Sequence, residues 1–192
     1  MAEIINNNLW QCDLEKILNF LPELEKLSGK NILITGANGL ICSSIVDVLI
    51  RYNETHEKKI NILAAGRNIK KIRERFNIYS GKNYFTYINY ETSRINYLPP
   101  EINYIIHGAS NAHPEAFLNE PVETMMSNIL GLKNLLEYSR ENKAQRILYI
   151  SSSEIYGKRE NNNNLAFNEK DLGYMDLLNM RNCYASSKRA AE

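Results

Sequence analysis

A serine, a tyrosine and a lysine in the C-terminal half of the chain have the residue types and the order needed to remove a proton from an alcohol. Tyr184 and Lys188 are four residues apart in a predicted helix, so they lie on one helical face, one turn apart. A free tyrosine has a pKa of about 10, but a neighbouring ammonium group stabilises the phenolate and lowers that pKa. Ser152, at the end of a predicted strand, would hydrogen-bond the same substrate oxygen. Together they predict proton abstraction while hydride leaves for a nicotinamide, with Lys188 also bonded to the cofactor ribose.

A glycine-containing turn nearer the N-terminus is the candidate cradle for such a cofactor. Gly36 permits a tight turn, and Gly39 lets the backbone approach a pyrophosphate. The helix that follows supplies free N–H groups and a partial positive charge. We therefore expect a dinucleotide to contact Gly36, Asn38, Gly39, Leu40 and Ile41. The alternative is an ordinary turn between a strand and a helix, which the strand–turn–helix context makes less favoured.

The residues after the second predicted strand bear on the choice between NAD and NADP. NAD-binding folds often place an acid there to hold the ribose hydroxyls, but this segment, residues 64–68, contains none. It contains Arg67 instead, and a guanidinium pairs bidentately with phosphate. The predicted cofactor is therefore NAD or NADP, with Arg67 favouring NADP. The alternative is a solvated arginine that opens a basic helix.

The elements that must position these residues follow from the apolar pattern of the chain. Strands are predicted over residues 31–35, 60–65, 84–89, 102–107 and 146–151, and helices over 40–52, 68–76, 121–142 and from 183 onward. Strands that alternate with helices indicate an α/β protein with a Rossmann-like, doubly wound parallel sheet and helices on both faces. Ligands of such sheets bind at the carboxyl ends of the strands, where the residues described above lie.

The first 28 residues precede this pattern. Apolar residues recur at helical spacing over 13–27, with Asp13 as the predicted N-cap and Pro22 as a kink. We therefore divide the chain into an N-terminal helical extension, residues 1–28, and a dinucleotide-binding domain, residues 29–192. The sequence leaves open whether the extension covers a sheet edge or contacts a partner.

Composition and charge disfavour several other classes of protein. The 192 residues carry 23 Lys+Arg and 22 Asp+Glu, a net charge of +1, which gives no basic field for nucleic acid. No apolar run approaches the ~20 residues of a membrane helix, and the N-terminus lacks the basic region of a secretion signal. Three cysteines are too few for a disulfide framework, and His107 and His113 have no neighbours at metal-ligand spacing. We expect a cytoplasmic protein without a metal, nucleic-acid partner or membrane partner.

The order of these motifs resembles the extended short-chain dehydrogenase/reductase superfamily. The turn Gly-x-x-Gly-x-x-Cys is similar to that superfamily's Gly-x-x-Gly-x-x-Gly, with Cys42 replacing the third glycine. The resemblance implies that Ala109 and Ser110, in the small-residue turn after the fourth strand, contact the cofactor. It also implies a supporting role for Asn128 within the long helix, and an acid near the adenine at Glu91.

Two further segments look like nucleotide-sugar enzymes of the epimerase/dehydratase type. The run Ser-Ser-Ser-Glu-Ile-Tyr-Gly at 151–157 and the run at 181–192 resemble UDP-glucuronate decarboxylases and sugar 4,6-dehydratases. By this resemblance Ser152 matches the catalytic Ser/Thr, Tyr184 the base and Lys188 its partner. Glu154 matches the glutamate that dehydratases and decarboxylases carry, although it is also compatible with a solvated loop acid. Ser153 stands where many dehydratases have an aspartate, which favours a decarboxylase or a GDP-mannose-type dehydratase.

The resemblance implies an enzyme that acts on a nucleotide sugar through transient oxidation at C4, and a homodimer at full length. It covers residues 29–192, and the superfamily's C-terminal substrate region has no counterpart in this sequence. Simple 4-epimerases usually lack the glutamate and are less favoured. The alternatives are an NADP-dependent alcohol or ketone reductase of the same superfamily, and a non-catalytic dinucleotide-binding module.

Overall fold

The computed structural model describes all residues except 1–4, 6, 95–96, 160–165 and 172. Its centre is a sheet of five strands in the order β3-β2-β1-β4-β5, in which every neighbouring pair is parallel. The strands are β1 Asn31–Thr35, β2 Asn61–Gly66, β3 Phe85–Asn89, β4 Tyr104–His107 and β5 Arg146–Tyr149. This order confirms the predicted doubly wound α/β fold, and it brings the carboxyl ends of β1 and β4 side by side.

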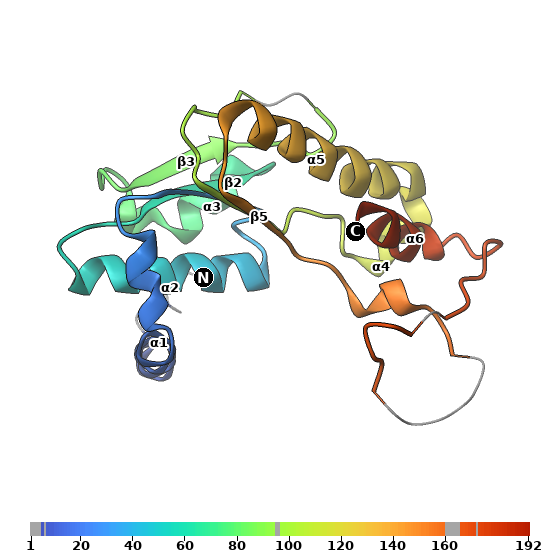
Figure 1. Ribbon diagram of the computed structural model, residues 1–192, viewed down its shortest axis with the longest axis horizontal. Coiled ribbons are helices and arrows are strands. Elements are labelled where there is room, and N and C mark those ends of the chain that lie inside the picture. The colour runs from blue at the N-terminus through green and yellow to red at the C-terminus, as the bar shows by residue number, and fades with distance from the viewer. Residues whose placement is uncertain (1–4, 6, 95–96, 160–165, 172) are drawn as a thin grey trace.

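The alternation of side chains along the strands assigns each helix to a face of the sheet. Ile32 and Ile34 of β1 belong to one buried cluster with residues of α2 (Leu40–Thr55) and α3 (Ile69–Arg75). Leu33 lies on the opposite face, in a cluster with Leu135 of α5 (Pro121–Asn142). The last helix, α6 (Asn182–Ala191), packs along α5 (Figure 1). Both faces of the central strands are therefore covered, which explains their continuous apolar sequences.

Short elements are where the structure departs most from the predicted ones. The apolar pattern of the sequence did not predict α4 (Pro114–Asn119) or the 3-10 helices η2 (Asn77–Tyr79) and η3 (Ser153–Tyr156). Elements of three to six residues are too short to show a period. The predicted strand at 146–151 ends at Tyr149, because the chain there turns toward η3.

The N-terminal helix differs from its prediction in both its start and its end. Helix α1 covers Asn8–Phe20, and the side chain of Asn7 accepts from the backbone of Leu9 at 2.9 Å. The prediction of Asp13 as the N-cap is wrong, because Asn7 satisfies the free N–H groups one turn and a half earlier along the chain. Pro22 ends the helix outright and begins a separate 3-10 helix, η1 (Pro22–Leu27).

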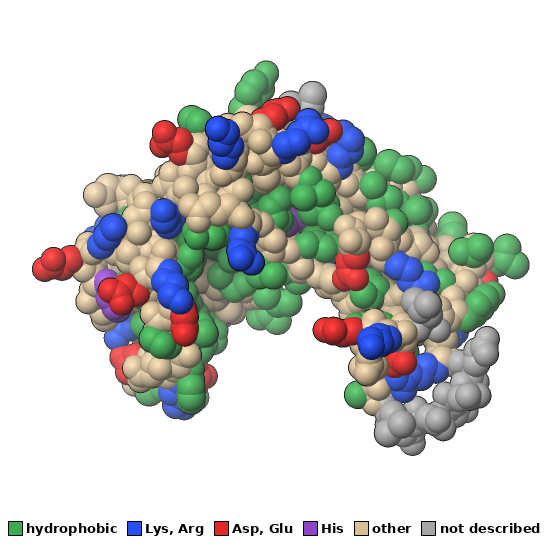
Figure 2. Space-filling model, in the orientation of Figure 1, with side chains coloured by type: hydrophobic (Ala, Val, Ile, Leu, Met, Phe, Trp, Pro, Cys, Tyr) green, Lys and Arg blue, Asp and Glu red, His purple; other side chains and the backbone are tan. Residues whose placement is uncertain are grey.

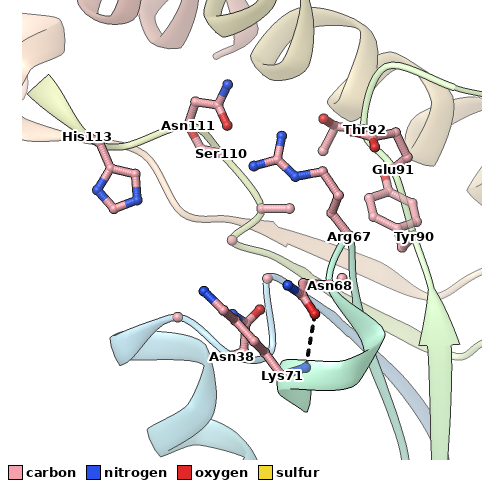
Figure 3. Close-up of a pocket in the computed structure, with 15 residues that line it drawn as sticks. Asn38, Arg67, Asn68, Lys71, Tyr90, Glu91, Thr92, Ser110, Asn111 and His113 are labelled. Carbon is pink, nitrogen blue, oxygen red and sulfur yellow. Dashed lines mark hydrogen bonds between the residues drawn. The ribbon is translucent and has the colours of Figure 1, made fainter. Parts of the chain in front are cut away.

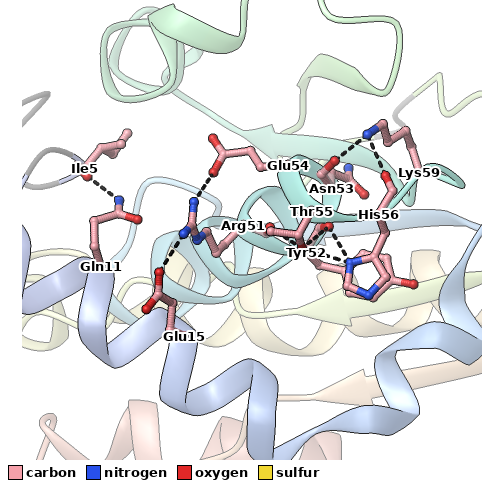
Figure 4. A network of polar contacts seen from close by, with 10 residues as sticks. All are labelled: Ile5, Gln11, Glu15, Arg51, Tyr52, Asn53, Glu54, Thr55, His56 and Lys59. Atoms are coloured by element: carbon pink, nitrogen blue, oxygen red, sulfur yellow. Dashed lines mark hydrogen bonds and ion pairs between the residues drawn. The ribbon is translucent and has the colours of Figure 1, made fainter.

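Polar contacts bind α1 to the outer side of α2. The indole N–H of Trp10 donates to Asp47 Oδ2 at 3.1 Å, and the same carboxylate forms a buried ion pair with Arg75 of α3. Arg51 pairs with Glu15 of α1 at 2.7 Å (Figure 4). The extension therefore packs on a helix of the α/β unit. No helix in the described part of the chain is long and apolar enough to cross a membrane.

Candidate active site

A pocket of about 340 Å³ opens at the carboxyl ends of the first four strands. Six of the residues predicted to bind a cofactor line it: Gly36, Asn38, Gly39, Arg67, Ala109 and Ser110. They come from the loops after β1, β2 and β4, which the parallel strand order brings to one edge of the sheet.

The glycine bend after β1 has a shape that only glycine allows. Gly36 has a φ of +72°, and a Cβ on it would lie 2.9 Å from the backbone of Gly108 and Ala109. Gly39 is the N-cap of the 16-residue helix α2, and no side chain caps that helix end. The first N–H groups of α2 thus have no side-chain cap, which fits a pyrophosphate at this helix end.

Leu40 and Ile41 lie differently from the other predicted cofactor residues. Their side chains are 86% and 58% exposed, and they line a second, apolar groove between η1 and α2 rather than the pocket. Hydrophobic side chains gather in the hollow on this side of the molecule (Figure 2). The first turn of α2 therefore presents its backbone N–H groups, and not these side chains, as possible contacts for a phosphate.

The wall formed by the loop after β2 is basic. Arg67 extends from the end of β2 toward Asn111 and Thr92, while Lys71 and Asn38 lie on the opposite side (Figure 3). Asn68 caps α3 by accepting from the backbone N–H of Lys71 at 3.0 Å. The pocket thus has two cations, Arg67 and Lys71, on different sides of the loop after β2.

Several residues that line the pocket were not predicted as site residues: Asn68, Lys71, Tyr90, Thr92, Asn111 and His113. Lys71 belongs to the basic helix start that the sequence already showed. Asn68 lies beside Arg67 in the loop after β2. The other four follow β3 and β4 and reach the pocket only because those strands flank β2 and β1, which the sequence pattern alone does not specify. Glu91, the predicted acid near an adenine, also lines the pocket.

A buried asparagine connects the cofactor turn to the helix that carries Tyr184. Ser110 donates to Asn128 Oδ1 at 2.7 Å, and Asn128 Nδ2 donates to Ser187 Oγ at 2.9 Å. Asn128 is fully buried. The turn after β4 and helix α6 are therefore fixed to each other through one side chain.

His107 is a packing residue in this fold. It is fully buried at the end of β4, where its Nδ1 lies 2.7 Å from Thr35 Oγ1. Burial lowers its pKa to about 4, so the ring is neutral at physiological pH. No group of three His, Cys, Asp or Glu side chains in the described residues is placed to hold a metal ion.

Cys42 occupies the space between α2 and the turn after β4. A Cβ on Gly108 would overlap the sulfur of Cys42. Burial raises the pKa of the thiol to about 11, which keeps it protonated. The cysteine at the third position of the glycine motif is therefore accommodated by a glycine on the facing strand end.

The predicted proton-transfer residues converge beyond the end of β5. Ser152 lies near enough to the Tyr184 phenol to favour the phenolate. The Tyr184 ring stacks on Phe117 with centroids 4.5 Å apart. Burial is the larger effect and raises the pKa of Tyr184. The sequence-based expectation of a lowered pKa is thus not met, because desolvation outweighs the stabilising effect of Ser152.

Lys188 lies next to this pair. Its Nζ is 5.9 Å from the centroid of the Tyr184 ring and donates to the carbonyl of Ile150 at 2.7 Å. The side chain is buried, and this lowers the pKa of Lys188 to about 8. Neither Lys188 nor Tyr184 lines the pocket of the glycine bend, but both lie on α6, which Asn128 ties to that pocket.

Glu154 lies in η3, two residues beyond Ser152. Its backbone N–H donates to Ser152 Oγ at 3.2 Å, and its carboxylate forms an ion pair with Arg181 at 2.9 Å. The structure therefore brings Ser152, Glu154, Tyr184 and Lys188 into one neighbourhood, and it adds Arg181, which the sequence did not single out.

Comparison with known proteins places the chain in a family. Residues 32–192 match the model of the NAD dependent epimerase/dehydratase family. The chain belongs to this family. It is 31% identical over 176 residues to UDP-glucuronic acid decarboxylase 1 of Danio rerio, an alignment that covers 91% of this chain and 38% of that protein.

Solved structures of the same fold carry different activities. A dTDP-glucose 4,6-dehydratase from Streptomyces venezuelae with NAD bound has a TM-score of 0.66 and 16% identity, covering 84% of this chain and 49% of that one. A yeast methylglyoxal/isovaleraldehyde reductase complexed with NADPH has a TM-score of 0.64 and 18% identity, covering 84% and 50%. The chain thus spans half or less of the length of these proteins.

Proposed function

We propose that the protein modifies a nucleotide sugar through transient oxidation at the sugar C4, with Tyr184 as the base. The observation that supports this most is that Ser152, Tyr184 and the Lys188 ammonium lie together beyond the end of β5. Tyr184 would take the proton of the C4 hydroxyl, and Ser152 would hold the same oxygen. Lys188 would stabilise the phenolate that Tyr184 needs.

The pocket at the glycine bend would hold the dinucleotide. Gly36 and Gly39 leave room for the pyrophosphate, and the turn at Ala109 and Ser110 would lie against the cofactor. A nicotinamide dinucleotide held there would supply a reversible hydride acceptor for C4, so no net oxidant would be consumed. Arg67 beside the pocket favours NADP, and binding of both dinucleotides to the protein and to an Arg67→Ala variant tests this. Tighter binding of NAD than of NADP would contradict the role of Arg67.

A decarboxylase or a GDP-mannose-type dehydratase fits the residues around Glu154 best. Once C4 is a ketone, a carboxylate at C5 is lost more easily, or a C5 proton becomes acidic. Glu154 is close enough to Tyr184 for its charge to affect the phenol, so it is placed to orient or move a proton near the same sugar. Ser153 offers no carboxyl group to protonate a leaving hydroxyl, which disfavours a dTDP-glucose-type dehydratase.

Mass spectrometry of products from a panel of UDP-, GDP- and dTDP-sugars tests the proposal. We expect loss of CO₂ or of water from one nucleotide sugar without net change in the dinucleotide. The panel is best run on the protein as it is naturally made, since the matched relatives are about twice as long or longer. We expect that protein to be a homodimer, and the 192-residue chain alone to bind sugar nucleotides poorly.

A second candidate is an NADP-dependent alcohol or ketone reductase. The yeast reductase of the same fold and the cations Arg67 and Lys71 favour it. Stoichiometric oxidation of NADPH with a simple ketone, and no conversion of any nucleotide sugar, would support the reductase and contradict the first proposal.

A further inference from the structure

A closed ring of contacts links the predicted proton-transfer residues, and Arg181 and Phe117 are its two members without a predicted role. Ser152 Oγ accepts from the backbone N–H of Glu154 at 3.2 Å, and it lies near enough to the Tyr184 phenol to lower its pKa. The Glu154 carboxylate pairs with Arg181, whose guanidinium lies 5.8 Å from the centroid of the Phe117 ring. Phe117 in turn stacks on Tyr184 and closes the ring.

The contact between Arg181 and Glu154 is two-pronged. Arg181 Nη2 donates to Glu154 Oε1 at 2.9 Å, and Nη1 donates to Oε2 at 3.3 Å. Both oxygens are engaged, so the fork fixes the direction as well as the place of the carboxylate. Arg181 directly precedes α6 and lies one turn before Tyr184. Its own backbone N–H donates to Asn179 Oδ1 at 3.0 Å, which holds the start of the helix in place.

A second arginine already anchors the backbone around Glu154. Arg189, two turns further along α6, donates from Nε to the carbonyl of Ile155 at 2.6 Å and from Nη2 to the carbonyl of Gly173 at 3.3 Å. Docking of η3 on α6 thus has a contact that does not touch the Glu154 carboxylate. The two arginines separate two roles, since Arg189 holds the backbone and Arg181 holds the acid.

We propose that Arg181 is a positioning residue that aims the Glu154 carboxylate at the carbon next to the oxidised C4. This inference rests on the proposed function. For a sugar with a C5 carboxylate, the bond from C5 to the carboxyl carbon breaks, its electron pair enters the C4–C5 enolate, and CO₂ leaves. The enolate then takes a proton at C5 from a water held by Glu154, and the hydroxide is neutralised by a proton from solvent. Arg181 acts only on this second half of the reaction, the chemistry at C5. Tyr184 and Ser152 carry out the first half, the oxidation at C4.

Arg181→Gln and Arg181→Lys separate these two halves. In Arg181→Gln we expect turnover to fall by about 10- to 100-fold, the scale of a displaced catalytic group. The 4-keto sugar and reduced nicotinamide should accumulate, because hydride removal continues while the step at C5 is slow. Lysine keeps the charge without the fork and should restore only part of the rate. Dinucleotide affinity should stay unchanged in both variants, since Arg181 does not line the cofactor pocket.

Two further variants decide whether the role is specific. Arg189→Gln weakens the backbone anchor only, and we expect no accumulation of the 4-keto sugar. Glu154→Gln should match Arg181→Gln, and the double variant should be no slower than Glu154→Gln alone. Unchanged turnover in Arg181→Gln, or equal accumulation in Arg189→Gln, would overturn the inference. If the unmodified protein converts no nucleotide sugar at all, the proposed function fails first and the inference fails with it.

Discussion

Replacing Gly108 by alanine tests the packing of the cofactor turn against the glycine-motif helix. The added methyl would overlap Cys42 Sγ and would also lie 3.1 Å from Ile150 Cδ1, so neither side offers space. Overpacking of this kind costs about 1–3 kcal/mol of the free energy of unfolding. For a chain of this size that corresponds to a fall in Tm of ~2–12 °C, at about 2–4 °C per kcal/mol. Thermal unfolding followed by circular dichroism measures the change.

The Cys42→Gly background is the matched control. It removes the sulfur that the new methyl meets, so Gly108→Ala should cost much less there than in the unmodified protein. The double-mutant cycle should give a coupling of ~0.5–3 kcal/mol between these contacting positions. Dinucleotide binding should weaken in Gly108→Ala alone, because a displaced α2 moves the N–H groups behind Gly39. An unchanged Tm in Gly108→Ala, or an equal cost in both backgrounds, would refute this reasoning.

Three other predictions address the base, a buried ring and the N-terminal extension. Tyr184→Phe should abolish turnover yet leave dinucleotide affinity nearly unchanged by calorimetry; retained turnover would refute the assignment. NMR titration of His107 should give a midpoint near 4, far below the 6.5 of an unfolded chain. Between pH 6.5 and 4 the unfolded state binds a proton that the folded state does not, so the free energy of unfolding should decrease as the pH falls through this range. A midpoint near 6.5 would contradict this. Trp10→Phe removes the 3.1 Å hydrogen bond to the buried Asp47 and should lower the unfolding free energy by about 1–3 kcal/mol in urea, whereas an unchanged midpoint would show that α1 is held by other contacts.

The sheet and the glycine bend could be predicted because local sequence determines them. Buried parallel strands need continuous apolar runs, and the bend needs a positive φ at Gly36, so both leave a pattern in the chain. Arg67 directly follows the second strand, and the turn at Ala109 and Ser110, which the family resemblance singled out, lies just beyond the fourth, so all three reach the pocket at the glycine bend. The strands fix the edge at which these residues meet.

Long-range packing left no comparable pattern. The fork between Arg181 and Glu154 joins residues 27 positions apart, and its existence depends on how η3 docks on α6. The raised pKa of Tyr184 follows from its burial beneath Phe117, a residue of the unpredicted helix α4. The N-cap was misassigned to Asp13 because the leucine pattern starts later than the helix does.

Transfer of the C4 hydrogen tests the central claim most directly. The protein as naturally made is given its best nucleotide sugar from the panel, labelled with deuterium at C4, and the product and dinucleotide are analysed by mass spectrometry. The account predicts that the deuterium remains in the sugar product and that the dinucleotide ends unreduced, because the hydride removed with the help of Tyr184 is returned. Deuterium that accumulates on the dinucleotide in proportion to product would contradict it. So would a Tyr184→Phe variant that remains active and shows no isotope effect on product formation.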